Sequence, residues 1–436
     1  MRNNSPRLLL SDPKGRIFEH SDLDATGMKA GYLFRLNPNE LIRLPAGSQL
    51  FKLPDRLPVG YDPQNRSFVN VPDACSVAAF AAPGYTITYS ASYSEDAKVD
   101  PLPLFSYGAC AIYENEVHVA AIRVDKGLRH DPTLIDLGLV KKRIPEFKKL
   151  FPANRLIRHL SRCATVHGCP NAQNFFRHRY EAPLPVSPSC NAACWGCISY
   201  QKGKIQCSQP RIKFIPSAEE VAQVALFHIT NVKDPIVSFG QGCEGEPLLQ
   251  GRILEASIKL IRKITPKGTI NINTNGSRPE ILARLFDAGL DSARISLNSA
   301  RERYYSRYYK PRGYTFKDVI ESIKVSKRKG AFLSLNYLTM PGFTDSHDEV
   351  AALTRLVEKY RVDMIQWRNL NYDPLLYFRQ MGIGQDISEM IGVRETMGSI
   401  KKRFPNLKMG YFNPVPLGAS RLGYGASPRA AASRRR

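Results

Sequence analysis

Three cysteines stand close together near the middle of the chain, in the segment SPSCNAACWGCISYQ. Their spacing is Cys190-x3-Cys194-x2-Cys197. Soft thiolates at such spacing suit an iron–sulfur cluster or zinc. A structural zinc ion normally takes four protein ligands, whereas three cysteines would leave one iron of a [4Fe–4S] cluster open. The triad therefore predicts a cluster whose open iron can bind an exchangeable ligand and pass it one electron.

The CxxxCxxC spacing resembles the signature of the radical S-adenosylmethionine (SAM) superfamily. The resemblance implies that Cys190, Cys194 and Cys197 hold a [4Fe–4S] cluster whose open iron binds SAM. Reductive cleavage of SAM would then give methionine and a 5′-deoxyadenosyl radical that abstracts a hydrogen atom. The family usually has an aromatic or bulky residue just before the last cysteine, whereas this chain has Gly196 there and Trp195 one position earlier.

Polar motifs that follow the later predicted strands carry the same resemblance. Gly245-Glu246-Pro247 resembles the family's GGEP motif, with Glu244 in the place of the first glycine. Thr274-Asn275-Gly276 resembles the TNG that follows the family's third strand. The residues that the resemblance assigns to SAM binding are Gly245, Glu246, Pro247, Asn275, Ser296, Asn298 and Gly342.

Strand patterns alternate with helical patterns from about residue 185 onward. The predicted strands cover residues 235–240, 269–273, 293–297, 332–338 and 363–369. With one more strand before Cys190, this alternation indicates about six parallel βαβ units. We therefore expect an α/β fold, a partial TIM-like (β/α)6 radical SAM barrel with its active site at the carboxyl ends of the strands.

A chain of 436 residues is long enough for two domains. Short β-type runs in the first 130 residues predict an N-terminal β-rich or α+β domain. We expect an accessory domain of unknown role over residues 1–165 and the barrel over 175–415. Residues 132–162 have a helical pattern that prolines 145 and 152 should break. The tail, 419–436, has five arginines and no acid, and is expected to be disordered.

Basic residues outnumber acidic ones by 62 to 39, which gives a net charge of +23. This excess favours an anionic partner, either RNA or an acidic peptide, although a soluble enzyme with a basic surface also fits. Residues 141–162 include eight Lys or Arg and one Glu, which form either a solvated face or a phosphate-contacting one. We see no signal peptide and no apolar run near the roughly 20 residues of a membrane span, so we expect a cytoplasmic protein without membrane insertion.

Six further cysteines lie outside the triad. Four of them cluster near it in the sequence and are candidates for a second iron–sulfur cluster: Cys163, Cys169, Cys207 and Cys243. The other interpretation is four buried free thiols, since free cysteine is commonly buried. A second cluster would bring the iron content to about eight per chain. His159 and His167 are alternative ligands nearby.

Three hypotheses for function follow from these features. The first two are a radical SAM enzyme that modifies RNA or a nucleotide, and one that modifies a peptide or protein; either would need an electron donor such as flavodoxin or ferredoxin. The third is a non-enzymatic iron–sulfur or zinc protein that binds nucleic acid through its basic face. Tyrosines and basic residues in 301–314 could stack bases and hold phosphates, but we favour a role in lining a pocket or packing on the barrel. Arg368 could bind a carboxylate or phosphate bidentately, or form a structural ion pair. The substrate and the fate of SAM, consumed or regenerated, stay open.

Overall fold

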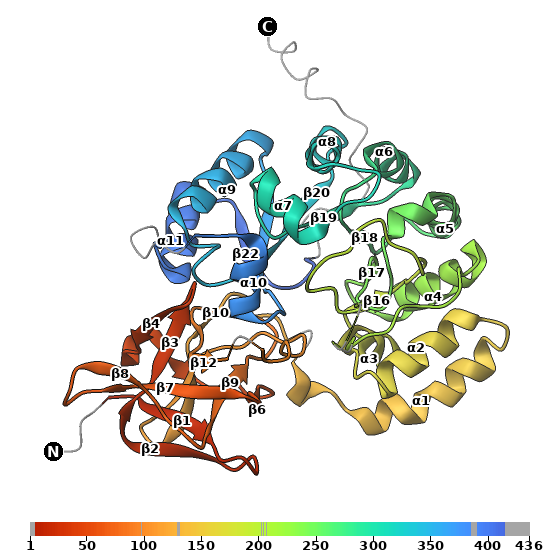
Figure 1. The fold of residues 1–436 in the computed structure, drawn as a ribbon. Helices are drawn as coiled ribbons and strands as arrows, with labels where there is room; N and C mark the ends of the chain where they lie inside the picture. The colour runs from red at the N-terminus through yellow and green to blue at the C-terminus, as the bar shows by residue number, and fades with distance from the viewer. Residues whose placement is uncertain are drawn as a thin grey trace, which may run out of the picture.

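The computed structural model of the protein describes residues 5–96, 98–128, 131–201, 203, 205, 207–384 and 390–414. The predicted basic tail at 419–436 lies outside these ranges. Two parts are visible in Figure 1: a β-rich N-terminal part in red and orange, and an arc of strands and helices that runs from green to blue. The predicted α/β half-barrel with an N-terminal β-rich region is confirmed.

The N-terminal part is built from antiparallel strands in three sheets of ten, three and two strands. The large sheet contains the path β12-β7-β2-β1-β13-β14-β5, with β6, β8 and β9 paired beside it. The strands are β1 (Arg7–Ser11), β2 (Ile17–Asp24), β3 (Thr26–Lys29), β4 (Tyr32–Arg35), β5 (Ile42–Arg43), β6 (Gln49–Lys52), β7 (Arg56–Asp62), β8 (Ser67–Asn70), β9 (Cys75–Phe80), β10 (Tyr85–Ile87), β11 (Ser90–Ala91), β12 (Tyr93–Glu95), β13 (Cys110–Tyr113), β14 (Glu116–Val119) and β15 (Ala121–Arg123).

The half-barrel is a seven-stranded parallel sheet whose strands neighbour one another in chain order. Its strands are β16 (Glu181–Pro183), β17 (Ile236–Phe239), β18 (Thr269–Thr274), β19 (Ser292–Leu297), β20 (Phe332–Thr339), β21 (Met364–Asn369) and β22 (Lys408–Gly410). The first six correspond to the predicted units. The seventh, β22, has only three residues and no alternating apolar pattern, so the sequence alone did not predict it.

Helices connect these strands and cover the outer face of the sheet (Figure 1). They are α4 (Ala218–Asn231), α5 (Gly251–Ile264), α6 (Pro279–Ala288), α7 (Glu302–Tyr309), α8 (Phe316–Arg328), α9 (His347–Tyr360), α10 (Pro374–Met381) and α11 (Val393–Arg403). Ser217 caps α4 in a capping box with Glu220, and Gly289 ends α6 at φ 118°, each a residue type that favours its position. Three 3-10 turns complete the elements: η1 (Pro38–Glu40), η2 (Pro132–Leu134) and η3 (Pro247–Gln250).

The two faces of the parallel sheet differ in chemistry. Ile270 and Ile272 of β18 are fully buried, as are the alternate apolar residues of its neighbours. Asn271 and Asn273 point the other way, where Asn271 donates to the Asn273 carboxamide and accepts from the Ser292 hydroxyl. Side chains alternate between the faces of a strand, so one face packs under the helices and the concave face is polar. A polar concave face leaves the barrel interior suited to a polar ligand.

Three helices before the barrel pack onto its core, at the lower right of Figure 1: α1 (Leu137–Leu150), α2 (Arg155–Thr165) and α3 (Pro170–Phe176). The ring of Phe147 lies 5.0 Å from Phe175 and 4.9 Å from Phe227 of α4. By packing, these helices are therefore part of the half-barrel, although α1 and α2 fall within the predicted accessory region 1–165. The expected break at Pro145 is wrong: Pro145 lies inside α1, where burial of Val140 and Phe147 offsets the lost hydrogen bond.

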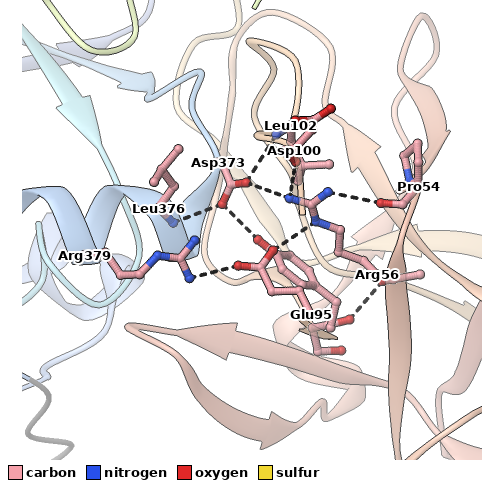
Figure 2. Close-up of polar contacts among 11 residues, drawn as sticks. Pro54, Arg56, Glu95, Asp100, Leu102, Asp373, Leu376 and Arg379 are labelled. Atoms are coloured by element: carbon pink, nitrogen blue, oxygen red, sulfur yellow. Dashed lines mark hydrogen bonds and ion pairs between the residues drawn. The ribbon is translucent and has the colours of Figure 1, made fainter. Parts of the chain in front are cut away.

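A buried network of charges joins the N-terminal part to the half-barrel (Figure 2). Arg56 of β7 lies 3.0 Å from the carboxylate of Glu95 and 3.2 Å from that of Asp373, just before α10. Glu95 also pairs with Arg379 of α10 at 2.9 Å. The Arg56 and Asp373 side chains are 3% and 1% exposed, so water hardly screens this pair.

Among the helices of the described ranges, none has the length and apolar character of a membrane span.

Acid should destabilise the fold through His228. This side chain of α4 is buried, its Nε2 lies 3.2 Å from the Tyr180 carbonyl oxygen, and burial lowers its pKa from 6.5 to about 4. Because the unfolded chain takes up this proton first, stability is full above pH 6.5 and falls as the pH drops toward 4, by about 3 kcal/mol from this group. Urea unfolding of wild type and His228→Gln at pH 7 and pH 5 should show the smaller loss in the variant; equal losses would contradict the assignment.

Candidate functional site

The three cysteines lie in a loop that follows β16 at the carboxyl end of the sheet. The end of α7 holds this loop: the amide of Ala193 donates to the Tyr309 carbonyl at 2.9 Å, and the amide of Trp195 donates to the Tyr308 carbonyl at 3.2 Å. Just beyond α7, the amide of Arg312 donates to the loop carbonyl of Asn191 at 2.8 Å. The tyrosine-rich segment 301–314 therefore packs against the cysteine loop and supports it.

The glycine before the last cysteine has a steric reason. A Cβ at Gly196 would lie 2.7 Å from the Tyr308 hydroxyl and 3.1 Å from the Asn371 carbonyl oxygen, so a side chain there would have to displace the Tyr308 hydroxyl and would crowd the Asn371 carbonyl. Tyr308 is buried and fills the adjoining space. The neighbouring Trp195 instead faces the Lys310 ammonium, which lies 2.9 Å from its ring centre. The family has a bulky residue before the last cysteine; here that position is Gly196, and Tyr308 of α7 fills the space beside it.

The three thiols of the loop differ in their surroundings. Burial, reinforced by the charge of Glu246, raises the pKa of the Cys190 thiol to about 11, and burial also raises the pKa of the Cys194 thiol well above its ordinary value. Burial also acts on Cys197, but its sulfur lies 3.4 Å from the Ser199 hydroxyl and 3.6 Å from an Arg211 nitrogen, and these groups lower its pKa overall. A cationic iron centre would stabilise all three thiolates, so this donor set fits a three-cysteine cluster.

The loop after β17 docks directly on the cysteine loop. The amide of Gly245 donates to the Ser187 carbonyl at 2.7 Å, and that of Glu246 donates to the Ser189 carbonyl at 2.9 Å. A side chain at position 245 would overlap the Ser189 carbonyl oxygen. Only glycine allows this approach, which brings the predicted Gly245-Glu246 motif beside Cys190.

Glu244 has a role that sequence reasoning missed. Its buried carboxylate accepts hydrogen bonds from the amides of Val186 at 2.8 Å and Ser187 at 3.1 Å, on the way to the cysteines. It also accepts from the amides of Gly240 and Gln241 in its own loop, at 2.5 and 3.0 Å. Burial raises its pKa to about 7 despite these donors. Glu244 therefore joins two loops. The sequence feature that could have indicated this role is an acidic residue where the family motif has a glycine.

Glu246 joins the same loop to the next one. Its carboxylate accepts from the amide of Leu248 at 3.0 Å, where it caps the turn that begins at Pro247, and from the amide of Asn275 at 2.8 Å. It also accepts a hydrogen bond from the Thr274 hydroxyl. Burial raises its pKa to about 7. The ends of β16, β17 and β18 are thus connected through three loops, because parallel strands present their carboxyl ends at one edge.

Two further predicted residues lie at the carboxyl end of the neighbouring strand β19, Ser296 within it and Asn298 directly after it. The hydroxyl of Ser296 accepts from the Asn336 side chain at 3.3 Å. Asn298 is fully buried and donates to the Tyr377 hydroxyl at 3.3 Å, and its side-chain oxygen has no hydrogen-bond partner within the described chain. A buried amide oxygen without a partner is available to a ligand's hydrogen-bond donor.

Gly342, the last of the predicted SAM contacts, lies in the loop after β20, against the N-terminal part. It has a φ of +91°, and a side chain there would overlap the backbone nitrogen of Ala30 in the N-terminal part. Its own amide donates to the Asp345 carboxylate at 2.6 Å. Its described contacts are therefore with the turn between β3 and β4 rather than with the other predicted residues, and glycine is needed there for a close approach between the two parts.

Comparison with known proteins agrees with this geometry. Residues 184–354 match the family described as the radical SAM superfamily. The chain contains a radical SAM domain. Members of this superfamily are enzymes, so the predicted superfamily and the prediction of an enzyme are both confirmed.

Solved structures of radical SAM enzymes resemble the chain at low identity. One is a radical SAM methyltransferase from Sphaerobacter thermophilus, at 13% identity over 55% of this chain and 68% of that one, with a TM-score of 0.40. Another is SuiB of Streptococcus suis bound to precursor peptide SuiA, at 14% identity over 60% and 61%, with a TM-score of 0.35. A third is the [FeFe]-hydrogenase maturase HydG from Carboxydothermus hydrogenoformans, at 14% identity over 58% and 63%, with a TM-score of 0.34.

The radical SAM domain brings only part of the predicted second cluster together. Cys163 and Cys243 lie close to each other, and the third member of their group is His159. Cys169 is buried next to them, with its amide 2.9 Å from the Cys163 carbonyl oxygen, but its thiol is not in the group. Cys207 is half-buried in another segment, where burial, and to a lesser extent the charge of Cys197, raises the pKa of its thiol. A second cluster held by all four cysteines stays a prediction.

Two guanidinium groups lie on the concave face of the radical SAM domain. Arg294 of β19 donates to the Gln366 side chain at 3.0 Å, and its Nε has no partner within the described chain. Arg368 of β21 donates to the Tyr411 carbonyl at 3.0 Å and lies over the Tyr411 ring at 4.1 Å. Burial and the charge of Arg368 lower the pKa of Arg294 to about 9. These two cations give the interior a positive region that favours an anionic group.

Glu246→Gln should weaken SAM binding more than it lowers cluster content. The carboxylate accepts hydrogen bonds from three donors. In glutamine, an amide nitrogen replaces one oxygen and would face one of these donors, and loss of that hydrogen bond costs about 1–3 kcal/mol of local interaction free energy. The SAM dissociation constant and the iron content of the reconstituted variant measure the two effects. Glu255→Gln on the surface of α5 is the matched control and should leave both unchanged. Equal loss of SAM binding and iron would make Glu246 purely structural.

Proposed function

We propose that the chain is a cytoplasmic radical SAM enzyme whose cluster is held by Cys190, Cys194 and Cys197 and whose substrate carries an anionic group. The observation that carries this proposal is the connection of the cysteine loop to the next two strand ends through Gly245 and Glu246. Backbone and carboxylate bonds hold these segments together, so the ligand set would be positioned before any cofactor binds.

The chemistry that the bound cluster would supply is one-electron reduction of SAM, which yields methionine and a 5′-deoxyadenosyl radical that abstracts hydrogen from the substrate. The electron would come from a flavodoxin- or ferredoxin-type donor. The protein's own tasks are binding, orientation and exclusion of water. We assign SAM contacts to the residues at the strand ends: Gly245, Glu246, Pro247, Asn275, Ser296 and Asn298.

The concave face supports an anionic substrate group. Within the part of the chain that the structure describes, neither Arg294 nor Arg368 has a carboxylate at ion-pair distance. Partly buried like charges are costly unless an anion compensates them. A phosphate or carboxylate between these guanidiniums would do so, with bidentate hydrogen bonds.

A basic groove favours nucleic acid over an acidic peptide as the source of that anion. The groove lies between α1 and α2 and has a volume of about 380 Å³. Its basic lining residues are Lys141, Lys148, Arg158 and Arg162. This is the region that the sequence indicated as a candidate phosphate-contacting face. Clustered lysines and arginines beside a groove suit a phosphate backbone.

The direct test of the proposed reaction is anaerobic iron–sulfur reconstitution, an EPR spectrum of the reduced protein, and a 5′-deoxyadenosine assay with dithionite and SAM. We expect a [4Fe–4S] signal that changes when SAM is added, together with formation of 5′-deoxyadenosine. A reconstituted cluster that produces no 5′-deoxyadenosine would refute the proposed reaction and favour a binding protein.

Binding to bulk tRNA should depend steeply on salt. Because Lys and Arg release counterions from phosphates, the logarithm of the binding constant should fall linearly with the logarithm of salt concentration. The double variant Lys141→Ala/Lys148→Ala should lower the slope by about 1–2, since each phosphate contact contributes about 0.7–0.9. Lys259→Ala, which removes an exposed lysine of α5, is the control. No slope in wild type, or the same slope in the double variant, would argue against nucleic acid in the groove.

A further inference from the structure

Three potential metal ligands meet outside the cysteine triad. His159 and Cys163 lie four residues apart on α2, and therefore on one face of the helix. Cys243 reaches the same place from the loop after β17. The ligand atoms of the three side chains all lie within 4.8 Å of one another, and His159 Nε2 is 3.4 Å from Cys163 Sγ.

This spacing fits one ion better than a cluster. For bond lengths of about 2.3 Å to sulfur and 2.0–2.1 Å to nitrogen, tetrahedral geometry places neighbouring ligand atoms roughly 3.5–3.8 Å apart. The separation between His159 and Cys163 is already close to that value. In a [4Fe–4S] cluster each cysteine binds a different iron, which requires thiolates farther apart than the ligands of a single ion.

The donor set selects the class of metal. Two thiolates and an imidazole are soft or borderline ligands, which prefer zinc over magnesium or calcium. Cys163 and Cys243 are buried, and His159 is half-buried, so an ion would be largely shielded from water. We propose that His159, Cys163 and Cys243 form a site for a single zinc-class divalent ion. The proposal does not depend on the reaction proposed for the cysteine triad.

Such an ion would fix a loop of the radical SAM domain. Cys243 directly precedes Glu244, whose carboxylate holds the backbone that leads to the cysteine triad. The carbonyl of Cys243 also accepts from the Ile212 amide at 2.8 Å. An ion between α2 and this loop would therefore position Glu244 and the Gly245 backbone through covalent connection. With three protein ligands, the ion would keep a fourth position open for water or another exchangeable ligand, and it would lie beside the cysteine loop.

Cobalt(II) titration of the full chain tests the site. The background is a Cys190→Ala/Cys194→Ala/Cys197→Ala variant, which removes the competing thiols of the triad. Under anaerobic conditions we expect about one equivalent of Co²⁺ to bind, with thiolate-to-cobalt charge-transfer absorption and the intense visible bands of tetrahedral cobalt. Zinc should displace it, because divalent zinc prefers the same donors.

Single substitutions in that background identify the ligands. His159→Gln and Cys163→Ser should each lose the tetrahedral cobalt bands, and the half-buried position of His159 makes its replacement compatible with folding. Cys110→Ser, at a buried cysteine of the N-terminal part, should keep them. Absent bands in the background variant, or bands that survive in both His159→Gln and Cys163→Ser, would overturn the proposal. About eight irons per reconstituted wild-type chain, carried by these residues, would also overturn it in favour of a second cluster.

Discussion

Replacement of Cys190, Cys194 and Cys197 together by alanine is expected to abolish formation of 5′-deoxyadenosine. Each thiolate is the only ligand that the loop offers to its iron, and the SAM-binding iron exists only when the other three are held. Single alanine variants should lose the product as well, since two cysteines cannot retain the cluster. Anaerobic assays with dithionite and SAM, read by chromatography of 5′-deoxyadenosine, measure this loss.

The matched control is Cys75→Ala, a half-buried cysteine of β9 in the N-terminal part. It should reconstitute and cleave SAM as the wild type does. Circular dichroism of the triple variant should be that of a folded protein, because the loop is held by backbone bonds from Tyr308 and Tyr309 rather than by the thiols. Reductive SAM cleavage by the folded triple variant would refute the proposed cluster site.

Asp373→Ala is expected to lower the free energy of unfolding by about 3–5 kcal/mol, because it leaves the buried Arg56 guanidinium without its second carboxylate. Asp373 also accepts from the amide of Leu102 at 3.3 Å and the Tyr93 hydroxyl at 3.2 Å, and it caps α10 through the amide of Leu376 at 3.1 Å (Figure 2). One substitution thus removes contacts from both sides of the junction. Urea unfolding followed by circular dichroism measures the change.

Two further variants test whether the expected loss of stability comes from the buried ion pair rather than from the removal of any carboxylate. Asp348→Ala removes an acid that is 77% exposed and lies 3.3 Å from Arg301, and it should change stability by less than about 1 kcal/mol. Arg56→Met/Asp373→Leu replaces the buried pair by apolar side chains and should recover part of the loss, since Glu95 keeps its ion pair with Arg379. Loss in Asp373→Ala no larger than in Asp348→Ala would show that the network does not hold the two parts together.

The sequence by itself determined the elements that local patterns specify. Cysteine spacing and the order of polar residues after Phe239, Thr274 and Leu297 predicted a radical SAM domain, because each motif is complete within a few residues. Alternation of strand and helix patterns predicted the parallel sheet in the same way. Ser217 and Gly289 cap their helices as their residue types favour, which is a local property too.

Tertiary structure decided what depends on contacts between distant residues. Glu244 reaches the backbone at Val186, Tyr308 fills the space beside Gly196, and Gly342 meets Ala30; none of these pairs is adjacent in the chain. Burial also overrode a local rule at Pro145, which stays inside α1. Long-range packing sets these features, and a local pattern carries no information about which distant segment will pack against it.

The cysteines include one group that the sequence indicated and one that only the tertiary structure brings together. The triad is local, since three ligands within eight positions must share one loop, and its spacing indicated a metal or cluster site that the later motifs identified further. The group of His159, Cys163 and Cys243 spans 85 positions and forms only because β17 ends beside α2. Counting cysteines therefore grouped four thiols, whereas the fold placed two of them with a histidine.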